Sequence, residues 1–375
     1  MTDTPSTGSS PAPLRMLLVG AGSMGRNWLR VLSSSTDVRL VGLVDLDVDL
    51  ARRAARDAGL EAVVVGPSLS DVAARSGAEA VVNVTVPAAH HPVTSEALFL
   101  GLPVLSEKPV APTLSQALSL AATAEVAGPL LMTSQSRRYY RTLAAFRNQI
   151  ASIGTLGIVT TEFFKAPRFG GFRDEMAHPL LVDMAIHPFD VVRYLLDASP
   201  ISVRCEAFHP PWSWYRGAAA AHAAFEFENG VRYLYTGSWC SPGLETSWNG
   251  TWRASGSDGS AVWDGENAPR VEIPGTPRAD VVGEPPAGPE EIAGALAEFV
   301  HSLRTGSTPS GEVHSNVMSL AMVEAAVRSA DTGERVVLAD LLEGAYQDAL
   351  AGETRAGVRD RLAAWGSAAS GLARP

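Results

Sequence analysis

The first 135 residues alternate short apolar runs with stretches of helical periodicity, and this alternation constrains the fold more than any other feature. The runs hold few polar residues, which is typical of strands that are buried on both faces of a sheet. Apolar strands that alternate with amphipathic helices form a parallel sheet covered by helices on both faces. The predicted strands are 15–20, 38–45, 62–65, 80–85 and 103–106.

A glycine-rich turn joins the first predicted strand to the first predicted helix. Gly20, Gly22 and Gly25 fit the pattern G-x-G-x-x-G. In this pattern the glycines allow a tight turn, close approach to a pyrophosphate, and close packing of the helix on the strand. Ser23 and Met24 begin the helix, whose free N–H groups favour an anion. The five residues are therefore predicted to form a dinucleotide site.

Asp45 ends the second predicted strand, 20 residues after Gly25. This is the spacing expected of a carboxylate that binds the ribose hydroxyls of an adenosine. A carboxylate there repels a 2′-phosphate, and the two residues that follow it are not basic. Arg52 and Arg53 lie a turn into the next helix and leave NADP open as an alternative. The pattern favours NAD over NADP as the cofactor.

After about Gln135 the pattern changes to longer strands in which polar and apolar residues alternate. The clearest pair, 223–228 and 231–235, flanks Asn229-Gly230, a favoured two-residue hairpin turn. Such strands form an open, mostly antiparallel sheet with helices on one face. The predicted organisation is a disordered tail (1–13), a nucleotide-binding Rossmann domain (14–135), a second α/β domain (136–340) and a C-terminal helical extension (341–375).

Composition excludes several classes of partner. The 375 residues carry a formal charge of -10, so the surface repels nucleic acid and anionic lipid. No apolar run reaches the ~18–20 residues that a membrane helix needs, and the first residues lack the features of an export signal. Two cysteines, Cys205 and Cys240, are too few for a disulfide framework, which favours a cytoplasmic location.

Two further segments carry side chains suited to catalysis. Glu107-Lys108-Pro109 directly follows the fifth predicted strand, at the carboxyl edge where ligands of such sheets bind. Asp183 and His187 lie four residues apart in a helical pattern over 179–196, so they are expected to share a face. An imidazole can take the proton of an alcohol, a carboxylate stabilises the imidazolium, and an amine stabilises charge on the oxygen.

Several of these motifs occur together and in this order in one family. Over about residues 14–340 the chain resembles the Gfo/Idh/MocA oxidoreductases, typified by glucose–fructose oxidoreductase and inositol 2-dehydrogenase. The motifs that carry the resemblance are GAGSMG with Asp45, Thr85-Val-Pro-Ala-Ala-His90, Leu105-Ser-Glu107-Lys108-Pro109, Gln135-Ser-Arg137-Arg138-Tyr139 and Asp183-x-x-x-His187-x-x-Asp190.

The resemblance implies an active site in the cleft between the two domains, with the second domain binding the substrate. It also implies a homodimer or homotetramer formed through the second sheet. In the roles that it implies, His187 is the general base, Asp183 orients it, and Lys108 binds the reacting oxygen beside the cofactor. The further positions that it implies near the nicotinamide are Thr85, His90 and Glu107, and near the substrate Arg137.

Other polar residues of this region are interpreted as structural. Asp190 is expected to bond a backbone group or Arg193. His178, Asp183 and His187 could hold a metal by residue type, but the family that the chain resembles uses none and nothing completes the site, so no metal is predicted.

The favoured function is an NAD-dependent dehydrogenase that acts on a secondary hydroxyl, or its ketone, of a sugar, cyclitol or related polyol. A second reading keeps the NAD bound and uses a transient ketone for elimination or glycoside cleavage without net redox. A third is a cofactor-binding sensor without catalysis, although such a protein is expected to lose the lysine or the histidine. The substrate cannot be named from the sequence because fold does not determine it.

Overall fold

The computed structural model of the protein describes residues 11–276 and 287–373. The tail predicted over 1–13 therefore lies outside the described residues, apart from 11–13. Within the described ranges, no helix combines the length and the apolar character needed to cross a bilayer.

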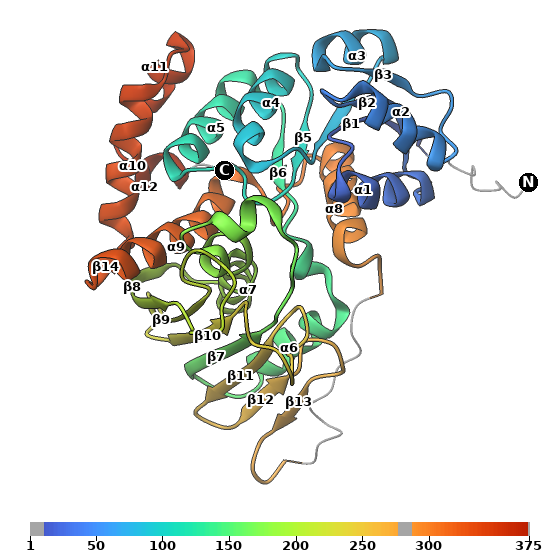
Figure 1. The fold of residues 1–375 in the computed structure, drawn as a ribbon. Helices are drawn as coiled ribbons and strands as arrows, with labels where there is room; N and C mark the ends of the chain where they lie inside the picture. Colours follow the sequence, from blue (N-terminus) through green and yellow to red (C-terminus); the bar gives the residue numbers. More distant parts are fainter. Residues whose placement is uncertain (1–10, 277–286, 374–375) are drawn as a thin grey trace, which may run out of the picture.

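A parallel sheet of six strands forms the N-terminal domain (Figure 1), which confirms the predicted Rossmann architecture. Its strand order is β3-β2-β1-β4-β5-β6, so the order reverses between β1 and β4, where ligands of such folds bind. Five of the strands are predicted from the sequence, whereas the sixth, β6, is not. The strands are β1 (Leu14–Val19), β2 (Val38–Val44), β3 (Val64–Gly66), β4 (Ala80–Asn83), β5 (Val104–Ser106) and β6 (Leu131–Thr133).

Helices from two distant parts of the chain cover this sheet. The N-terminal ones are α1 (Ser23–Ser34), α2 (Val48–Asp57), α3 (Leu69–Ser76), α4 (Pro87–Phe99) and α5 (Leu114–Ala127). Helix α8 (Glu291–Thr305) belongs by sequence to the region 136–340, yet it packs here (Figure 1). Its Leu296 and Phe299 share a buried core with Trp28 of α1. The chain thus returns to its first domain after building most of the second.

The second sheet has eight strands in the order β13-β12-β11-β7-β10-β9-β8-β14. Within the described part of this second sheet, β7 and β10 form the only parallel pair, and the other neighbours are antiparallel. The predicted hairpin is β9–β10, but its loop has three residues, 228–230, and not two, because the Phe227 N–H bonds the Val231 carbonyl (3.0 Å). Gly230 takes the positive φ of this loop, at 81°. The strands are β7 (Leu156–Phe164), β8 (Pro200–Phe208), β9 (Ala220–Phe227), β10 (Arg232–Ser238), β11 (Thr251–Gly256), β12 (Ser260–Trp263), β13 (Arg270–Glu272) and β14 (Val336–Val337).

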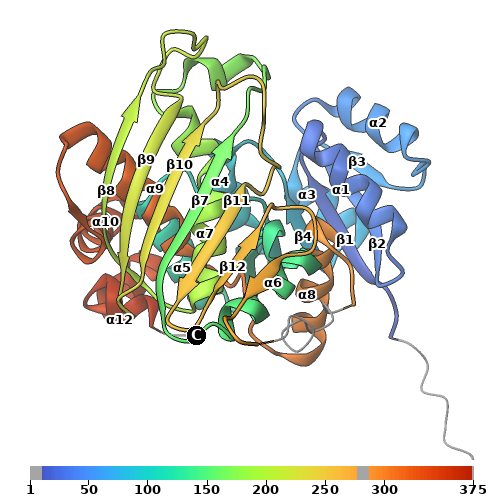
Figure 2. The same cartoon turned by 90° about the horizontal axis from the view of Figure 1, so that it is seen from below.

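Helices cover one face of this sheet and leave the other open, as Figure 2 shows. The covering helices are α6 (Arg141–Ala151), α7 (Ile186–Leu196) and α9 (Val313–Thr332). Alternation along the strands explains the asymmetry, because apolar residues point to the helices at every second position. Phe189 of α7, for example, lies with its ring centroid 4.9 Å from that of Phe225 and 5.4 Å from that of Tyr235. This packing fixes α7, which carries a candidate catalytic residue.

The C-terminal extension consists of more than one helix. It divides into α10 (Leu338–Gly352), α11 (Ala356–Trp365) and α12 (Ala368–Leu372). The break is at Glu353, whose carboxylate accepts hydrogen bonds from the Ser119 hydroxyl (2.6 Å) and the Arg355 N–H (2.8 Å). Ser119 is on α5, so the extension is anchored to the first domain while its helix α10 also contacts β8 of the second.

Candidate active site

The glycine turn after β1 contains two glycines that packing requires and one that leaves space. Gly20 has a φ of 108°, and a Cβ there would lie 2.8 Å from the Val84 carbonyl oxygen. A Cβ on Gly25 would overlap the carbonyl of Gly20, so α1 can pack this closely only without a side chain. A Cβ on Gly22 would meet nothing within 4 Å. The backbone at Gly22 is therefore open to a ligand.

The start of α1 offers donors and a neighbouring carboxylate. Gly22 is the N-cap and no side chain caps the helix, so its first N–H groups point to solvent or ligand. Asp45 lies against the turn: its Oδ2 accepts from the Ala21 N–H (2.7 Å) and its Oδ1 from the Asp47 N–H (2.9 Å). Open backbone, free N–H groups and this carboxylate fit a dinucleotide, with the pyrophosphate at the helix and the ribose near Asp45.

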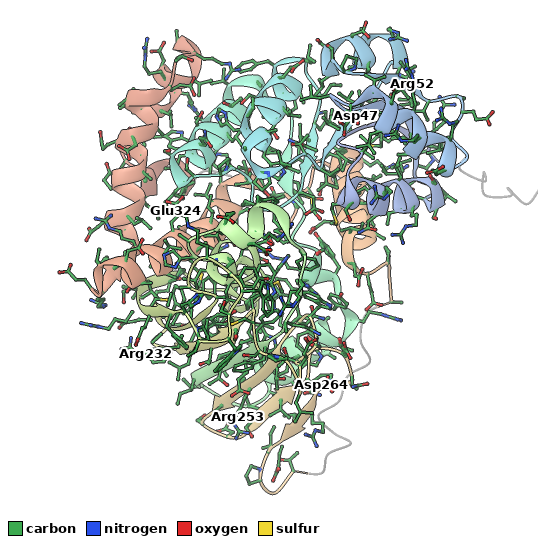
Figure 3. All side chains as sticks on the ribbon, viewed as in Figure 1. Asp47, Arg52, Arg232, Arg253, Asp264 and Glu324 are labelled. Atoms are coloured by element: carbon green, nitrogen blue, oxygen red, sulfur yellow. The ribbon has the colours of Figure 1, made fainter. Side chains whose placement is uncertain are left out.

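Arg52, one of the two arginines that follow this carboxylate in the sequence, is directed elsewhere. Arg52 forms an ion pair with Asp49 (3.2 Å) within α2, and both side chains are more than half exposed. Figure 3 shows Arg52 on the outer rim of the domain, where Asp47 also lies. Arg52 therefore does not turn back to Asp45, where it would be needed to hold a 2′-phosphate.

Three residues expected near the nicotinamide brace the carboxyl edge of the sheet. The Thr85 hydroxyl donates to Asn83 Oδ1 (2.8 Å). The buried His90 ring lies between the carbonyl oxygens of Thr85 (3.0 Å) and Pro109 (2.6 Å), and burial lowers its pKa. The buried Glu107 accepts from the Trp28 indole N–H (2.9 Å), and burial raises its pKa. These contacts join the loops after β4 and β5, so they set the position of Lys108.

Lys108 joins the two domains. Its Nζ donates to the Asp183 carbonyl (2.9 Å) and lies 3.6 Å from Asp183 Oδ1, across 75 residues of sequence. The peptide bond between Lys108 and Pro109 is cis. The other carboxylate oxygen of Asp183 accepts from Arg173 Nε (2.5 Å), which belongs to the 3₁₀ helix Gly171–Glu175. Asp183 thus takes one cation on each oxygen while its side chain stays 18% exposed.

His187 lies beside this pair but is not bonded to the carboxylate. The helix expected over 179–196 begins with a π-helical turn, Leu180–Met184, in which the Ala185 N–H bonds the Leu180 carbonyl. The extra residue in this turn changes the i,i+4 relation, so among the described residues Asp183 makes no hydrogen bond to His187. Nδ1 of His187 is enclosed without a partner in the described parts of the chain. Burial, then the charges of Lys108 and Arg137, hold the pKa of His187 well below its usual range.

Arg137 lies where two cavities meet. It lines a small cavity together with His187, and it also lines a cleft of about 780 Å³ that runs along α1 and α8. Trp248 lines both as well. The guanidinium donates to Asn249 Oδ1 (2.5 Å), and the Asn249 amide is fixed by the Gly265 carbonyl (2.7 Å). Arg137 and Trp248 therefore separate the cleft along α1 and α8 from the side of His187, where the cavity has only about 10 Å³.

The structure adds a charged pair that the sequence did not indicate. Arg138 donates through Nε and Nη2 to both oxygens of Asp190, each at 2.7 Å, and Ser319 donates to the same carboxylate at 2.7 Å. Asp190 was expected to bond a backbone group or Arg193; instead Arg193 donates to Ser319 (2.8 Å). The pair fixes α7 against the 3₁₀ helix Ser136–Tyr139, so it holds His187 and Arg137 in relation to each other. The only signal was the paired arginines of the Arg137-Arg138 motif.

His178 is directed away from the site. Its Nε2 lies 2.8 Å from Asp331 Oδ1, near the end of α9. Within residues 11–276 and 287–373, no three His, Cys, Asp or Glu side chains gather in a way that could hold a metal ion.

Two family models match the chain, and together they cover more than half of it. Residues 14–135 match the oxidoreductase family with an NAD-binding Rossmann fold, and residues 151–262 match the GFO/IDH/MocA C-terminal domain. The matches define an NAD-binding oxidoreductase, as predicted from the glycine turn and Asp45. The chain belongs to the GFO/IDH/MocA family, which confirms the resemblance noted in the sequence.

Similar proteins of known name agree with this assignment. The 1,5-anhydro-D-fructose reductase of Ensifer adhaerens is 25% identical over 329 residues, which is 84% of this chain and 96% of that one. Inositol 2-dehydrogenase 4 of Saccharopolyspora erythraea is 32% identical over 197 residues, 51% of this chain and 57% of that one. An oxidoreductase from Agrobacterium radiobacter, crystallised with NAD+, L-tartaric acid and magnesium, has the same fold, with a TM-score of 0.78 at 20% identity over 88% of this chain and 99% of that one.

Proposed function

We propose that the protein is an NAD-dependent dehydrogenase that acts on a secondary hydroxyl, or the corresponding ketone, of a sugar, cyclitol or related polyol. The observation that carries the proposal is the reach of Lys108 from the end of β5 to Asp183 in the second domain (2.9 Å to its carbonyl). The contact supports a site at the carboxyl edge of the nucleotide-binding sheet, where a substrate would meet the nicotinamide. The charge of Lys108 acts on His187, which supports a role for both side chains at this site. The names of relatives, which are dehydrogenases and reductases of such polyols, support the same class.

The dinucleotide would be held by the first domain. The open backbone at Gly22 and the N–H groups of Ser23 and Met24 would receive the pyrophosphate, and Asp45 would accept the ribose hydroxyls. Thr85, His90 and Glu107 would shape the nicotinamide end through the loops that they brace. When bound, NAD supplies the ring that takes the hydride from the carbinol carbon.

Side chains of both domains would accept the proton and stabilise the charge. His187 is neutral near pH 7 because its pKa is lowered, so it can accept the hydroxyl proton. Nδ1 is enclosed, which leaves Nε2 to face the substrate. The Lys108 ammonium would donate to the same oxygen and stabilise the negative charge that develops as the proton leaves. Asp183, between Lys108 and Arg173, would hold that ammonium in place.

The test is an initial-rate screen of sugars and cyclitols, in both directions and with NAD and NADP. We expect NAD-linked turnover by the natural chain. His187→Ala and Lys108→Ala should each lower kcat about 10²- to 10⁴-fold while NAD still binds, because general acid–base groups contribute on that scale. NAD binding by both variants, measured by titration, is the control for folding. Unchanged rates in either variant would reject the assignment of these residues. If the natural chain released a product without net formation of NADH, elimination or glycoside cleavage would be favoured instead.

We also propose that the open face of the second sheet forms the interface of a homodimer or homotetramer. Large apolar side chains are exposed on its strands among charged ones: Ile158, Ile201, Phe208 and Leu234, with Arg232 and Arg253 (Figure 3). An apolar surface of this kind is typical of an interaction site. Light scattering coupled to size exclusion tests the proposal, and Leu234→Glu should shift the protein towards the monomer.

A cytoplasmic location is the compartment that we propose for this enzyme. Cys205 and Cys240 are both free thiols buried in the second domain. Fractionation of cells that express the natural chain would test the location directly.

A further inference from the structure

Three cations lie at the candidate site, and Arg137 is the one without a carboxylate partner among the described residues. Lys108 contacts the carbonyl and carboxylate of Asp183, and Arg173 contacts the same carboxylate. Arg137 contacts an uncharged amide, that of Asn249. Among the described residues, no carboxylate lies within 4.0 Å of its guanidinium. The carboxylate that acts on it from further away, Glu291, accepts the Tyr140 hydroxyl instead (2.5 Å).

The guanidinium is also held in one place and partly desolvated. Asn249 Oδ1 accepts from Nη1 of Arg137, and the amide group of Asn249 is fixed in turn by the Gly265 carbonyl (2.7 Å). An arginine has five N–H donors arranged in a planar fork. The hydrogen bond to Asn249 uses one of them, so the fork keeps donors for a ligand. A preorganised arginine fork matches the geometry of a carboxylate.

The position of Arg137 relates this fork to the chemistry. It lines the cleft of about 780 Å³ along α1, and it also lines a cavity of only about 10 Å³ with His187. A group that binds Arg137 from the cleft would therefore lie close enough to His187 to belong to the molecule whose hydroxyl faces it. An imidazolium forming at His187 would be repelled by Lys108 and Arg137 together. A negative substituent on Arg137 would offset one of these cations when the proton is transferred.

We propose that the substrate is an anionic polyol, a sugar acid or related polyhydroxy carboxylate, whose carboxylate binds Arg137 while a secondary hydroxyl of the same molecule faces Lys108 and His187. This inference rests on the proposed dehydrogenase function and names its substrate class. A single arginine fork suits a carboxylate monoanion better than a phosphate dianion, which commonly takes several donors or a helix N-terminus. Arg137 is therefore the residue that would determine specificity.

The experiment compares matched pairs that differ only at one carbon: glucose with glucuronate, and galactose with galacturonate. Rates with NAD are measured for the full chain, and binding to the NADH-loaded chain is measured by calorimetry. We expect kcat/KM or affinity to favour the acid by about 10-fold or more, as loss of a charged hydrogen bond is on this scale. Arg137→Gln should bring the ratio of acid to neutral sugar close to one, and Arg137→Lys should retain part of it.

A matched control variant distinguishes a direct contact with Arg137 from the effect of the overall positive charge around the site. Arg168 stacks over Trp214 at 3.9 Å in the nearby loop and is exposed, so Arg168→Gln removes the same charge without touching Asn249. We expect the ratio of acid to neutral sugar to stay unchanged in this variant. Thermal unfolding of each variant shows whether the fold is intact.

The outcomes distinguish the two proposals. If neutral sugars are oxidised as well as their acids, and Arg137→Gln leaves the ratio unchanged, the anionic substrate is wrong and the dehydrogenase stands. If no compound is oxidised, the proposed function fails, and the binding measurement alone decides: tighter binding of the acids that Arg137→Gln abolishes supports the inference, and equal binding overturns it. Tighter binding of glucose 6-phosphate than of glucuronate would also overturn it.

Discussion

Two carboxylates of the second domain lie seven residues apart and have different surroundings. Asp190 is 1% exposed and receives three hydrogen bonds at 2.7 Å, two of them from the fork of Arg138. The Asp183 side chain is 18% exposed, and the contact of its Oδ1 with Lys108 Nζ is long, at 3.6 Å. The first pair is enclosed and fully bonded, whereas the second is partly exposed and loosely bonded. A buried ion pair whose hydrogen bonds are all satisfied serves the structure, so Arg138–Asp190 is called the framework pair. A pair that is partly exposed and not fully bonded is where chemistry can occur, so Lys108–Asp183 is called the accessible pair.

The largest expected effect is on stability, at the framework pair. Arg138→Ala should lower the free energy of unfolding by about 3–5 kcal/mol, because it leaves the buried Asp190 charge without its partner. Urea denaturation measures the change. Arg147→Ala is the control: Arg147 lies 4.2 Å above the Tyr194 ring, a contact worth about 0.5–1 kcal/mol. Similar losses in both variants would show that Asp190 is not the framework that its contacts indicate.

The next effect is on catalysis, at the accessible pair. Asp183→Asn should lower kcat/KM about 10- to 100-fold, because a small displacement of the Lys108 ammonium is costly to the reaction. The free energy of unfolding should change by less than about 1 kcal/mol, since the pair is partly exposed. Glu245→Gln is a matched control, as Glu245 pairs with Lys165 (3.0 Å) outside the site. An Asp183 variant that unfolds but retains activity would reverse the comparison.

The pH dependence of catalysis offers a smaller effect. Burial, Lys108 and Arg137 lower the pKa of His187, so the acidic limb of kcat/KM should lie below the ordinary histidine range. Arg137→Gln removes one cation and should move this limb to higher pH, because the imidazolium is then less repelled. Rates across pH for a slow neutral substrate measure the shift. A limb that moves to lower pH in the variant would show that the charge of Arg137 does not act on His187.

The smallest expected effect concerns another charged link between the domains, at His314. His314 of α9 bonds Glu312 (2.7 Å) and Glu125 of α5 (2.9 Å). Burial opposes ionisation, but the two carboxylates outweigh it and raise the pKa of His314. Because the folded pKa lies above the unfolded value of about 6.5, the stabilisation is complete below that pH and is lost as the pH rises through the folded pKa.

Comparison with a variant isolates this contribution. The natural chain should be more stable than His314→Gln near pH 6, and the difference should shrink as the pH approaches about 9. Urea unfolding at several pH values measures it. If the difference in free energy of unfolding grew with rising pH, His314 would have to be neutral in the folded protein. That outcome would contradict the role assigned to its bonds with Glu312 and Glu125.

Much of the first domain could be predicted from the sequence because its signals are local. The strand, the glycine turn and the helix occupy consecutive residues, and Asp45 comes one strand later. The position of the hairpin at Asn229-Gly230 likewise follows from a few neighbouring residues. Lys108 could be placed at the carboxyl edge because a parallel sheet brings all such edges together. These features depend on steric preferences and periodicity, which a single sequence carries in full.

The tertiary structure alone decided which charges meet. Arg138 finds Asp190 across 52 residues, and Arg137 finds Asn249 across 112. The π-helical turn before His187 and the return of α8 to the first sheet depend on packing that periodicity does not record. The physical reason is that a charge can pair with any opposite or polar group that folding brings near it. Local patterns thus determine the elements, and the pairing of distant side chains, which makes a binding site of them, follows only from the packing of those elements.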